Sequence, residues 1–146
     1  MSIINIYTDG SCNPKTKIGG WAFIAKIEKG LHLFSKSERN TTNNRMELTA
    51  IIEAIKYYSS KYKKIVIYSD SLLSINCASK LWKRKENLDL WKEYDITSDG
   101  KTIQFVKVLA HSGDEYNEMV DKLAKNEMIK ETSIDCKRNE TSIGRE

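Results

Sequence analysis

The first third of the chain carries the alternation of apolar and polar positions that is typical of β-strands. The first alternating positions are Ile4, Ile6 and Thr8. They stop at the sequence "DGS", which predicts that this strand ends at Asp9 and that the chain turns at Gly10. Two further segments, 21–27 and 31–38, flank the sequence "EKG", which predicts a hairpin that continues the sheet.

Two later segments replace this alternation with apolar residues at helical spacing. The first predicts a helix over Arg45–Tyr58, with an apolar stripe formed by Met46, Ile51, Ile52, Ile55 and Tyr58. The second predicts a helix over residues 116–129, with inward-facing residues Met119, Val120, Leu123, Ala124 and Met128.

The intervening segments complete the sheet. The β-branched run "KIVIYSD" predicts a buried central strand that ends on Asp70. Short helices are expected over residues 71–80 and 88–95, and "TIQFVKVLAHSG" predicts a final strand that leads into a turn. Because the strands come first as a meander and then alternate with helices, this order predicts an α/β fold with helices on both faces of the sheet.

The length of 146 residues suffices for one domain with a full hydrophobic core. No linker rich in proline, glycine or serine divides the sequence, so we expect a single domain over residues 1–129. Residues 130–146 are polar and lack a sustained periodicity, so we expect them to form a frayed, flexible tail.

Charge and cysteine content narrow the class of protein. The 24 basic and 20 acidic residues give a net charge of +4 and a pI near 8.9, which suits a polyanionic partner without proving one. Cys12, Cys77 and Cys136 are odd in number and widely spaced, so we expect neither a disulfide framework nor a zinc site. No signal peptide or membrane-length apolar run is visible, so we expect a soluble, cytoplasmic protein without a membrane partner.

Three aspartates are candidates for a shared site. Asp9 and Asp70 each follow an apolar strand, and ligands bind at the carboxyl ends of strands in open α/β sheets. Asp121 lies close to the buried stripe of the last helix, where an uncompensated carboxylate would be costly. Each also has a structural interpretation: Asp9 as a turn residue, Asp70 as a helix N-cap, and Asp121 as a rim residue paired with Lys122 or Lys125.

Glu47 belongs to the sequence "TTNNRMELTA", which opens the helix over Arg45–Tyr58. Asn44 followed three residues later by Glu47 matches a capping box, in which Asn44 caps the helix and Glu47 reaches back to the N-cap amide. Taken alone, this pattern favours a structural role for Glu47. Only partners elsewhere in the chain can add a chemical role.

The segments "YTDGS", "TTNNRMELTA", "YSDS" and "AHSGDEYNEMVDKLA" resemble, in this order and spacing, type 1 ribonuclease H. The resemblance spans residues 3–128, and "TTNNRMEL" together with the "HSG…N…D" pattern is its most specific part. It implies the ribonuclease H-like five-stranded mixed sheet with helices on both faces. The metal-binding acids of the family fall on Asp9, Glu47, Asp70 and Asp121, and its mobile histidine falls on His111.

The implied activity is Mg²⁺-dependent, endonucleolytic hydrolysis of the RNA strand of RNA–DNA hybrids, which leaves 5′-phosphate and 3′-hydroxyl ends. Two Mg²⁺ ions, with Mn²⁺ as an expected substitute, would share the four acids, and His111 would assist proton transfer or product departure. We expect a monomer. Two alternatives share the fold: a non-catalytic hybrid-binding module, which the intact acids argue against, and a recombinase-type relative acting on DNA, which "TTNNRMEL" and "AHSG" argue against.

The resemblance also implies which residues contact the hybrid. They are Gly10, Ser11 and Cys12 on the RNA strand, Thr42, Asn43 and Asn44 on phosphate and minor groove, and Trp82, Lys83, Arg84 and Lys85 along the DNA strand. Core packing of Trp82 and a merely solvated "KRKE" face remain open as alternatives. Leu72 stands where the family commonly has a glutamine that touches bases, and the basic protrusion is short, so we expect modest, salt-dependent binding.

Overall fold

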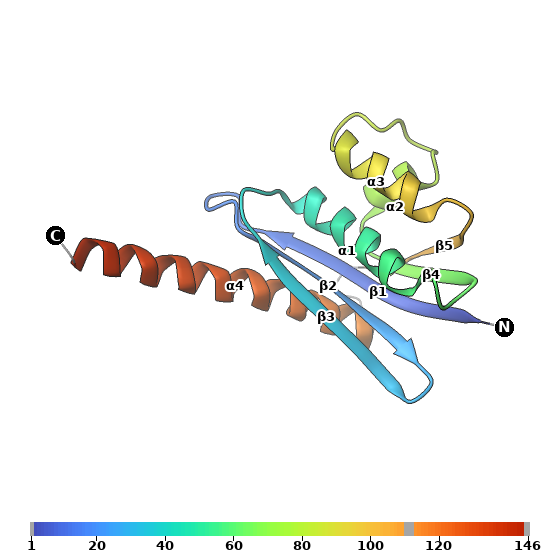
Figure 1. Ribbon diagram of the computed structural model, residues 1–146, viewed down its shortest axis with the longest axis horizontal. Helices are drawn as coiled ribbons and strands as arrows, with labels where there is room; N and C mark the ends of the chain where they lie inside the picture. The colour runs from blue at the N-terminus through green and yellow to red at the C-terminus, as the bar shows by residue number, and fades with distance from the viewer. Residues whose placement is uncertain (1, 110–112, 145–146) are drawn as a thin grey trace.

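A single five-stranded sheet forms the centre of the computed structural model, which describes residues 2–109 and 113–144, with side chains as far as Lys137. The strands are β1 (Ile3–Cys12), β2 (Gly19–Ile27), β3 (Gly30–Glu38), β4 (Lys64–Ser69) and β5 (Thr102–Lys107). They lie in the order β3-β2-β1-β4-β5 (Figure 1). The first three strands pair antiparallel, whereas β4 pairs parallel with both β1 and β5, so the sheet is mixed as the resemblance implies.

Helices cover both faces of this sheet, which confirms the predicted α/β class. The helices are α1 (Asn43–Tyr58), α2 (Leu72–Ala78), α3 (Leu88–Ser98) and α4 (Glu115–Gly144). Helix α1 packs on one face with α3 beside it, and α4 crosses the opposite face (Figure 1). The bounds differ from the sequence prediction by only a few residues for α1, α2 and α3.

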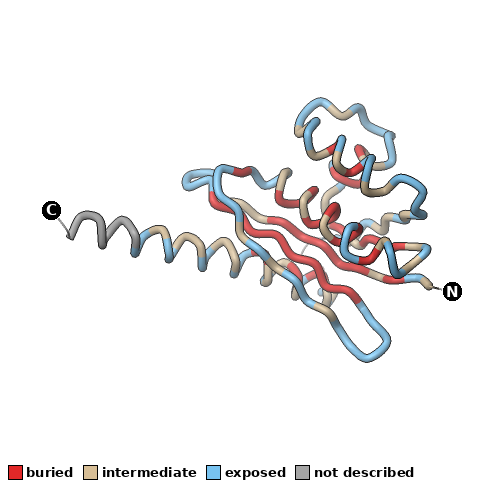
Figure 2. The backbone as a smooth tube through the Cα atoms, viewed as in Figure 1, coloured by how far each residue is buried: buried red, intermediate tan, exposed pale blue. Residues whose placement is uncertain are grey.

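The alternation of side chains along β2 divides the core between the two faces. Trp21 and Phe23 join the larger cluster under α1, whereas Ala22 and Ile24 pack against α4. Buried residues therefore follow the centre of the sheet and the inner side of α1 (Figure 2). All five apolar residues predicted for the α1 stripe are buried, so the helical period was the correct guide there.

The predicted end of the first strand at Asp9 is wrong. Strand β1 continues to Cys12, so Asp9 lies within the strand and Gly10 is a strand residue and not a turn. Gly10 is needed for a different reason: a Cβ atom there would lie 2.3 Å from the backbone nitrogen of Glu47. The absence of a side chain lets the backbone of β1 touch the first turns of α1.

The segment after residue 129 is helical and not irregular as the sequence predicted, because α4 is a 30-residue helix that continues to Gly144. Its C-terminal part projects past the sheet (Figure 1). Arg39, which follows β3, forms ion pairs with Glu131 at 2.6 Å and with Asp135 at 2.7 Å. Polar contacts with the end of the edge strand therefore support a segment that has no apolar stripe.

Within residues 2–109 and 113–144, no helix combines the length and the apolar character needed to cross a membrane. Cys12, Cys77 and Cys136 are all free thiols.

Candidate active site

The candidate site lies where β1 and β4 separate. These parallel strands pair residue by residue as far as Tyr7 and Tyr68, the last partners in their register. Strand β4 ends one residue later, at Ser69, while β1 continues to Cys12. Asp70 therefore leaves the end of β4 and Asp9 lies two residues beyond the last pair, so both carboxylates line the opening. The strand-end prediction for Asp70 is confirmed, and its interpretation as an N-cap is wrong, because Ser71 caps α2.

Glu47 reaches the same opening from the helix on the α1 face. The capping box predicted with Asn44 does not form: α1 starts earlier, and the Thr42 hydroxyl accepts a hydrogen bond from the Arg45 N–H at 3.2 Å. Glu47 lies in the second turn of the helix, and its Oε1 accepts a hydrogen bond from the Gly10 N–H at 3.3 Å. The close approach at Gly10 thus brings the Glu47 carboxylate beside Asp9.

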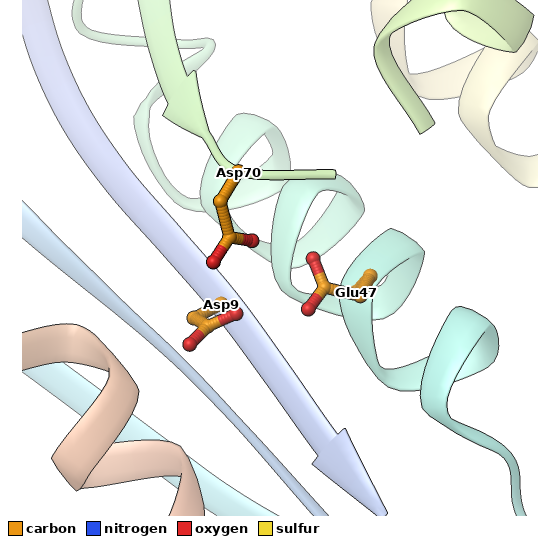
Figure 3. Close-up of side chains that lie close together, drawn as sticks. All are labelled: Asp9, Glu47 and Asp70. Atoms are coloured by element: carbon orange, nitrogen blue, oxygen red, sulfur yellow. The ribbon is translucent and has the colours of Figure 1, made fainter. Parts of the chain in front are cut away.

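Asp9, Glu47 and Asp70 form the carboxylate cluster, in which one oxygen atom of each residue lies within 4.8 Å of the others (Figure 3). Asp9 and Glu47 are only 3% and 6% exposed. Glu47 Oε2 is buried without a hydrogen-bond partner, and no lysine or arginine in the described part of the chain forms an ion pair with Asp9 or Glu47. Three hard oxygen donors this close together fit a divalent cation.

The electrostatics of the carboxylate cluster favour proton uptake when no cation is bound. Burial raises the pKa of Asp9 from 3.8 to about 7; a hydrogen bond shared with Glu47 offsets part of this rise, and Asp70 adds to it. Burial also raises the pKa of Glu47 well above its usual range, and the neighbouring Asp9 raises it further. Desolvation therefore contributes more than the mutual repulsion of the acids, although both act in the same direction.

Asp121 approaches the carboxylate cluster from the other face of the sheet. It lies on α4, and its carboxyl is within hydrogen-bonding reach of Asp9, whose pKa it raises. Its side chain is 25% exposed, and Oδ2 pairs with Lys125 Nζ at 3.1 Å. The ion pair with Lys125 matches one sequence interpretation, and the proximity to Asp9 matches the other. Asp121 is thus a fourth acid at the rim of the cluster.

Comparison with known proteins shows which family this chain belongs to. The sequence profile of the RNase H family matches residues 1–129. The chain belongs to the ribonuclease H family. It is 36% identical to Ribonuclease H of Thermoanaerobacter sp. (strain X514), over 90% of this chain and 94% of that protein. It is 41% identical to Ribonuclease H of Caldanaerobacter subterraneus subsp. tengcongensis, over 88% of this chain and 92% of that protein.

A solved structure shows the same fold. The N-terminal RNase H domain of Rv2228c from Mycobacterium tuberculosis, determined as a fusion with maltose-binding protein, matches with a TM-score of 0.81. The match covers 91% of this chain and 98% of that one at 18% identity, which is enough to establish the fold. The profile and the curated relatives identify this ribonuclease H family member as an endoribonuclease.

The residues expected on the RNA and phosphate side lie around the opening of this ribonuclease H site. Ser11 and Cys12 extend β1 beyond Asp9, and the Cys12 thiol donates to the Thr41 carbonyl at 3.4 Å. The exposed residues Thr42, Asn43 and Asn44 form the N-cap and first turn of α1. His111 lies outside the described residues, so its predicted place beside the acids stays a prediction.

The basic segment, Trp82–Lys85, divides into outward and inward residues. Trp82 is 45% exposed, which excludes its interpretation as a core residue, and Lys83 and Lys85 are exposed as well. Arg84 turns inward: its side chain is 14% exposed and its guanidinium lies 4.5 Å from the centre of the Trp91 ring. It donates to the Cys77 carbonyl at 2.9 Å and pairs with Asp95 at 2.7 Å. Arg84 is thus largely engaged within the protein, and its contact with phosphate stays a prediction.

Arg45 is a residue whose role sequence reasoning missed. Its guanidinium forms two hydrogen bonds with the Asp89 carboxylate, at 3.0 and 2.8 Å, and a third with Asn87 Oδ1 at 3.2 Å. The pairing lowers the pKa of Asp89 to about 2. These bonds tie the first turn of α1 to the start of α3. The partners lie more than 40 residues apart, so no local pattern predicts the contact.

Proposed function

We propose that this chain is a divalent-metal-dependent endonuclease that hydrolyses the RNA strand of RNA–DNA hybrids and leaves 5′-phosphate and 3′-hydroxyl ends. The observation that supports this proposal is that Asp9, Glu47 and Asp70 converge from β1, α1 and the end of β4 on one site. Asp121 lies at the rim of that site. These four acids would hold two Mg²⁺ ions, for which Mn²⁺ can substitute. Bound as a pair, such ions supply an activated water and relieve charge on the leaving oxygen.

The protein residues contribute position and desolvation. Gly10 fixes Glu47 through its N–H, and it leaves space for the backbone contact that sets the distance between β1 and α1. Asp70, at the end of β4, and Asp121, on α4, bring negative charge from two further directions. Because Asp9 and Glu47 are buried and form no ion pair in the described part of the chain, their free energy in the absence of cations is high, which favours cation binding.

Substrate contacts follow from what remains accessible around the site. The backbone N–H groups of Asn43 and Asn44 belong to the first turn of α1, so no preceding helical turn accepts their hydrogen bonds. A helix N-terminus of this kind favours phosphate. Trp82, Lys83 and Lys85 offer an exposed ring and two ammonium groups for the DNA strand. The backbone of Gly10–Cys12 would face the RNA strand, and His111 would aid proton transfer or product release.

All four acids come from one chain, which supports a monomer as the active species. The test is incubation of the protein with a strand-labelled RNA–DNA hybrid, an RNA duplex and a DNA duplex, each with Mg²⁺, Mn²⁺ or EDTA. We expect cleavage of the RNA strand of the hybrid alone, and only with metal. End analysis should show 5′-phosphate and 3′-hydroxyl groups. Binding of the hybrid without turnover would instead support a non-catalytic module, and cleavage of the DNA duplex would contradict the proposed substrate.

A further inference from the structure

Three tyrosines lie directly behind the acids, one on each of three acid-bearing elements. Tyr7 is two residues before Asp9 on β1, and Tyr68 is two residues before Asp70 on β4. Tyr116 is five residues before Asp121 on α4. We call Tyr7, Tyr68 and Tyr116 the tyrosine stack. Neither the strand alternation nor the helical period gives a reason for an aromatic ring at all three positions.

The rings of the tyrosine stack contact one another. Tyr7 and Tyr68 are stacked, with ring centroids 4.4 Å apart and an interplanar angle of 12°. Tyr116 packs on Tyr7 at 5.4 Å with a tilt of 40°, and Lys26 Nζ lies 4.7 Å from the centre of the Tyr116 ring. The Tyr68 hydroxyl donates to Asn5 Oδ1 at 3.0 Å, which fixes that ring along the sheet. Offset aromatic pairs of this geometry are favourable beyond the apolar area they bury.

The tyrosine stack lies at the point where the two acid-bearing strands separate. Tyr7 and Tyr68 are the last register partners before β1 and β4 separate, so their stacked rings stand at the base of the opening that holds the acids. Tyr116 joins α4 to the same point, on the face opposite α1. Glu47 is fixed independently from the α1 face, through Gly10. The stack is therefore a side-chain contact that links the three elements carrying Asp9, Asp70 and Asp121.

We propose that Tyr7, Tyr68 and Tyr116 are positioning residues that set the spacing of the Asp9, Asp70 and Asp121 carboxylates for divalent cations. This inference rests on the proposed function of those acids. A loss of ring contact would let the two strands and α4 shift by fractions of an ångström, which a cation demanding near-ideal octahedral geometry would not tolerate. Outer residues that orient metal ligands typically change metal affinity by about 10-fold or more when they are replaced.

The test compares Tyr68→Leu and Tyr116→Leu with Tyr68→Phe, because leucine keeps apolar bulk and phenylalanine keeps the ring. Tyr68 and Tyr116 are only partly buried, so folded variants are more accessible there than at Tyr7, which is 7% exposed. The matched control is Phe34→Leu. Phe34 also stacks on an aromatic neighbour, Phe23, at 5.6 Å and 11°, but it belongs to the edge strand β3 under α1.

The readout without substrate is a titration of thermal stability with MgCl₂, and the second readout is the Mg²⁺ concentration for half-maximal cleavage. We expect both midpoints to rise about 10-fold in the two leucine variants and to stay within about twofold in Tyr68→Phe and Phe34→Leu. An equal loss of stability in Tyr68→Leu and Phe34→Leu with unchanged Mg²⁺ midpoints would make the stack merely structural and overturn the proposal.

Mg²⁺ titrations of the parent protein and of Asp70→Asn distinguish failure of the positioning proposal from failure of the proposed function. If Mg²⁺ raises the melting temperature of the parent but not of Asp70→Asn, the metal site stands and the tyrosine variants decide the positioning role. If Mg²⁺ leaves the parent itself unchanged and hybrid cleavage needs no metal, the acids do not bind cations, and the positioning proposal falls with the proposed function.

Discussion

The carboxylate cluster and the basic segment are both groups of like charge, yet the fold gives their side chains opposite surroundings. Asp9 and Glu47 are buried without a cationic partner in the described part of the chain, and each has a raised pKa. In the basic segment, the residue that is most buried, Arg84, has a carboxylate, a backbone carbonyl and an aromatic ring as partners. The two lysines beside it stay in solvent.

The difference shows how to separate functional from structural charge. A buried charge that has partners within the protein is partly compensated by them, and removal of one member of such a pair is destabilising. A buried charge without partners destabilises the fold and persists only where a ligand completes it. This criterion supports the proposed metal-binding role of Asp9 and Glu47, assigns Arg84 mainly to packing, and leaves the exposed Lys83 and Lys85 accessible to a polyanion.

The largest expected effect is on activity at the carboxylate cluster. Asp70→Asn replaces a charged ligand at the end of β4 by a neutral amide of the same size, so we expect hybrid cleavage to fall by about a thousandfold or more, equivalent to about 4 kcal/mol. Steady-state cleavage of a labelled hybrid in Mg²⁺ measures it. The control is Asp99→Asn, an exposed aspartate at the end of α3, which should cleave normally. Comparable activity in the two variants would remove Asp70 from the site.

The second effect is on stability against pH in the metal-free protein. The folded pKa of Asp9, about 7, lies above its ordinary value of 3.8, so the folded state holds more protons than the unfolded state between these limits. Stability should therefore fall as pH rises from about 4 to about 7, the reverse of the usual behaviour of a salt-bridged carboxylate. Thermal melts in EDTA across this range measure the fall.

Two comparisons sharpen this pH prediction. Asp9→Asn cannot ionise, so its melting temperature should depend less on pH and should exceed that of the parent near pH 8 in EDTA. Saturating Mg²⁺ should restore the stability of the parent at that pH but give Asp9→Asn a much smaller gain. A parent curve that rises from pH 4 to pH 7 in EDTA would show that the acids are not held protonated in the fold.

Sequence pattern predicted the elements with strong periodicity and the acid that follows a strand end, Asp70. The sheet, the α1 stripe and the place of Asp70 are of this kind, because each depends on a local rule. The local pattern alone favours a capping role for Glu47, because Asn44 precedes it by three residues. The helix instead begins at Asn43 with Thr42 as its N-cap, and the capping rule depends on the actual first turn. The contact that matters, with Gly10, joins residues 37 positions apart.

The helical extension of α4 and the inward contacts of Arg84 also depend on residues that lie far apart in the sequence or on separate elements. The extension of α4 has no sustained series of apolar residues at helical spacing. The contact between Arg39 and Glu131 that helps to hold it to the rest of the protein joins residues 92 positions apart. Arg84 belongs to a run that reads as a solvated basic face, and only the fold places Trp91 and Asp95 beside it. Long-range polar contacts leave no periodic trace in a sequence, so they could not be predicted from it.

The third effect separates Arg84 from its neighbours by stability. Arg84→Ala removes an ion pair, a hydrogen bond to the end of α2 and the contact with Trp91, so we expect a loss of about 2 kcal/mol in the free energy of unfolding. Urea denaturation measures the loss. Lys83→Ala, which removes an exposed lysine beside it, should leave the unfolding curve unchanged. Equal stability of the two variants would contradict the inward role of Arg84.

The smallest effect is on substrate binding by the lysines that remain. Replacing Lys83 and Lys85 by alanine should raise KM for the hybrid several-fold at low salt with little change in kcat, because phosphate contacts hold substrate and transition state about equally. The dependence of log KM on log salt should become shallower by about one to two units. A double variant of Lys63 and Lys101 is the matched control, since both are exposed and precede β4 and β5 at the end away from Asp70. An equal rise in KM in both double variants would mean that net charge, and not a track beside Trp82, governs binding.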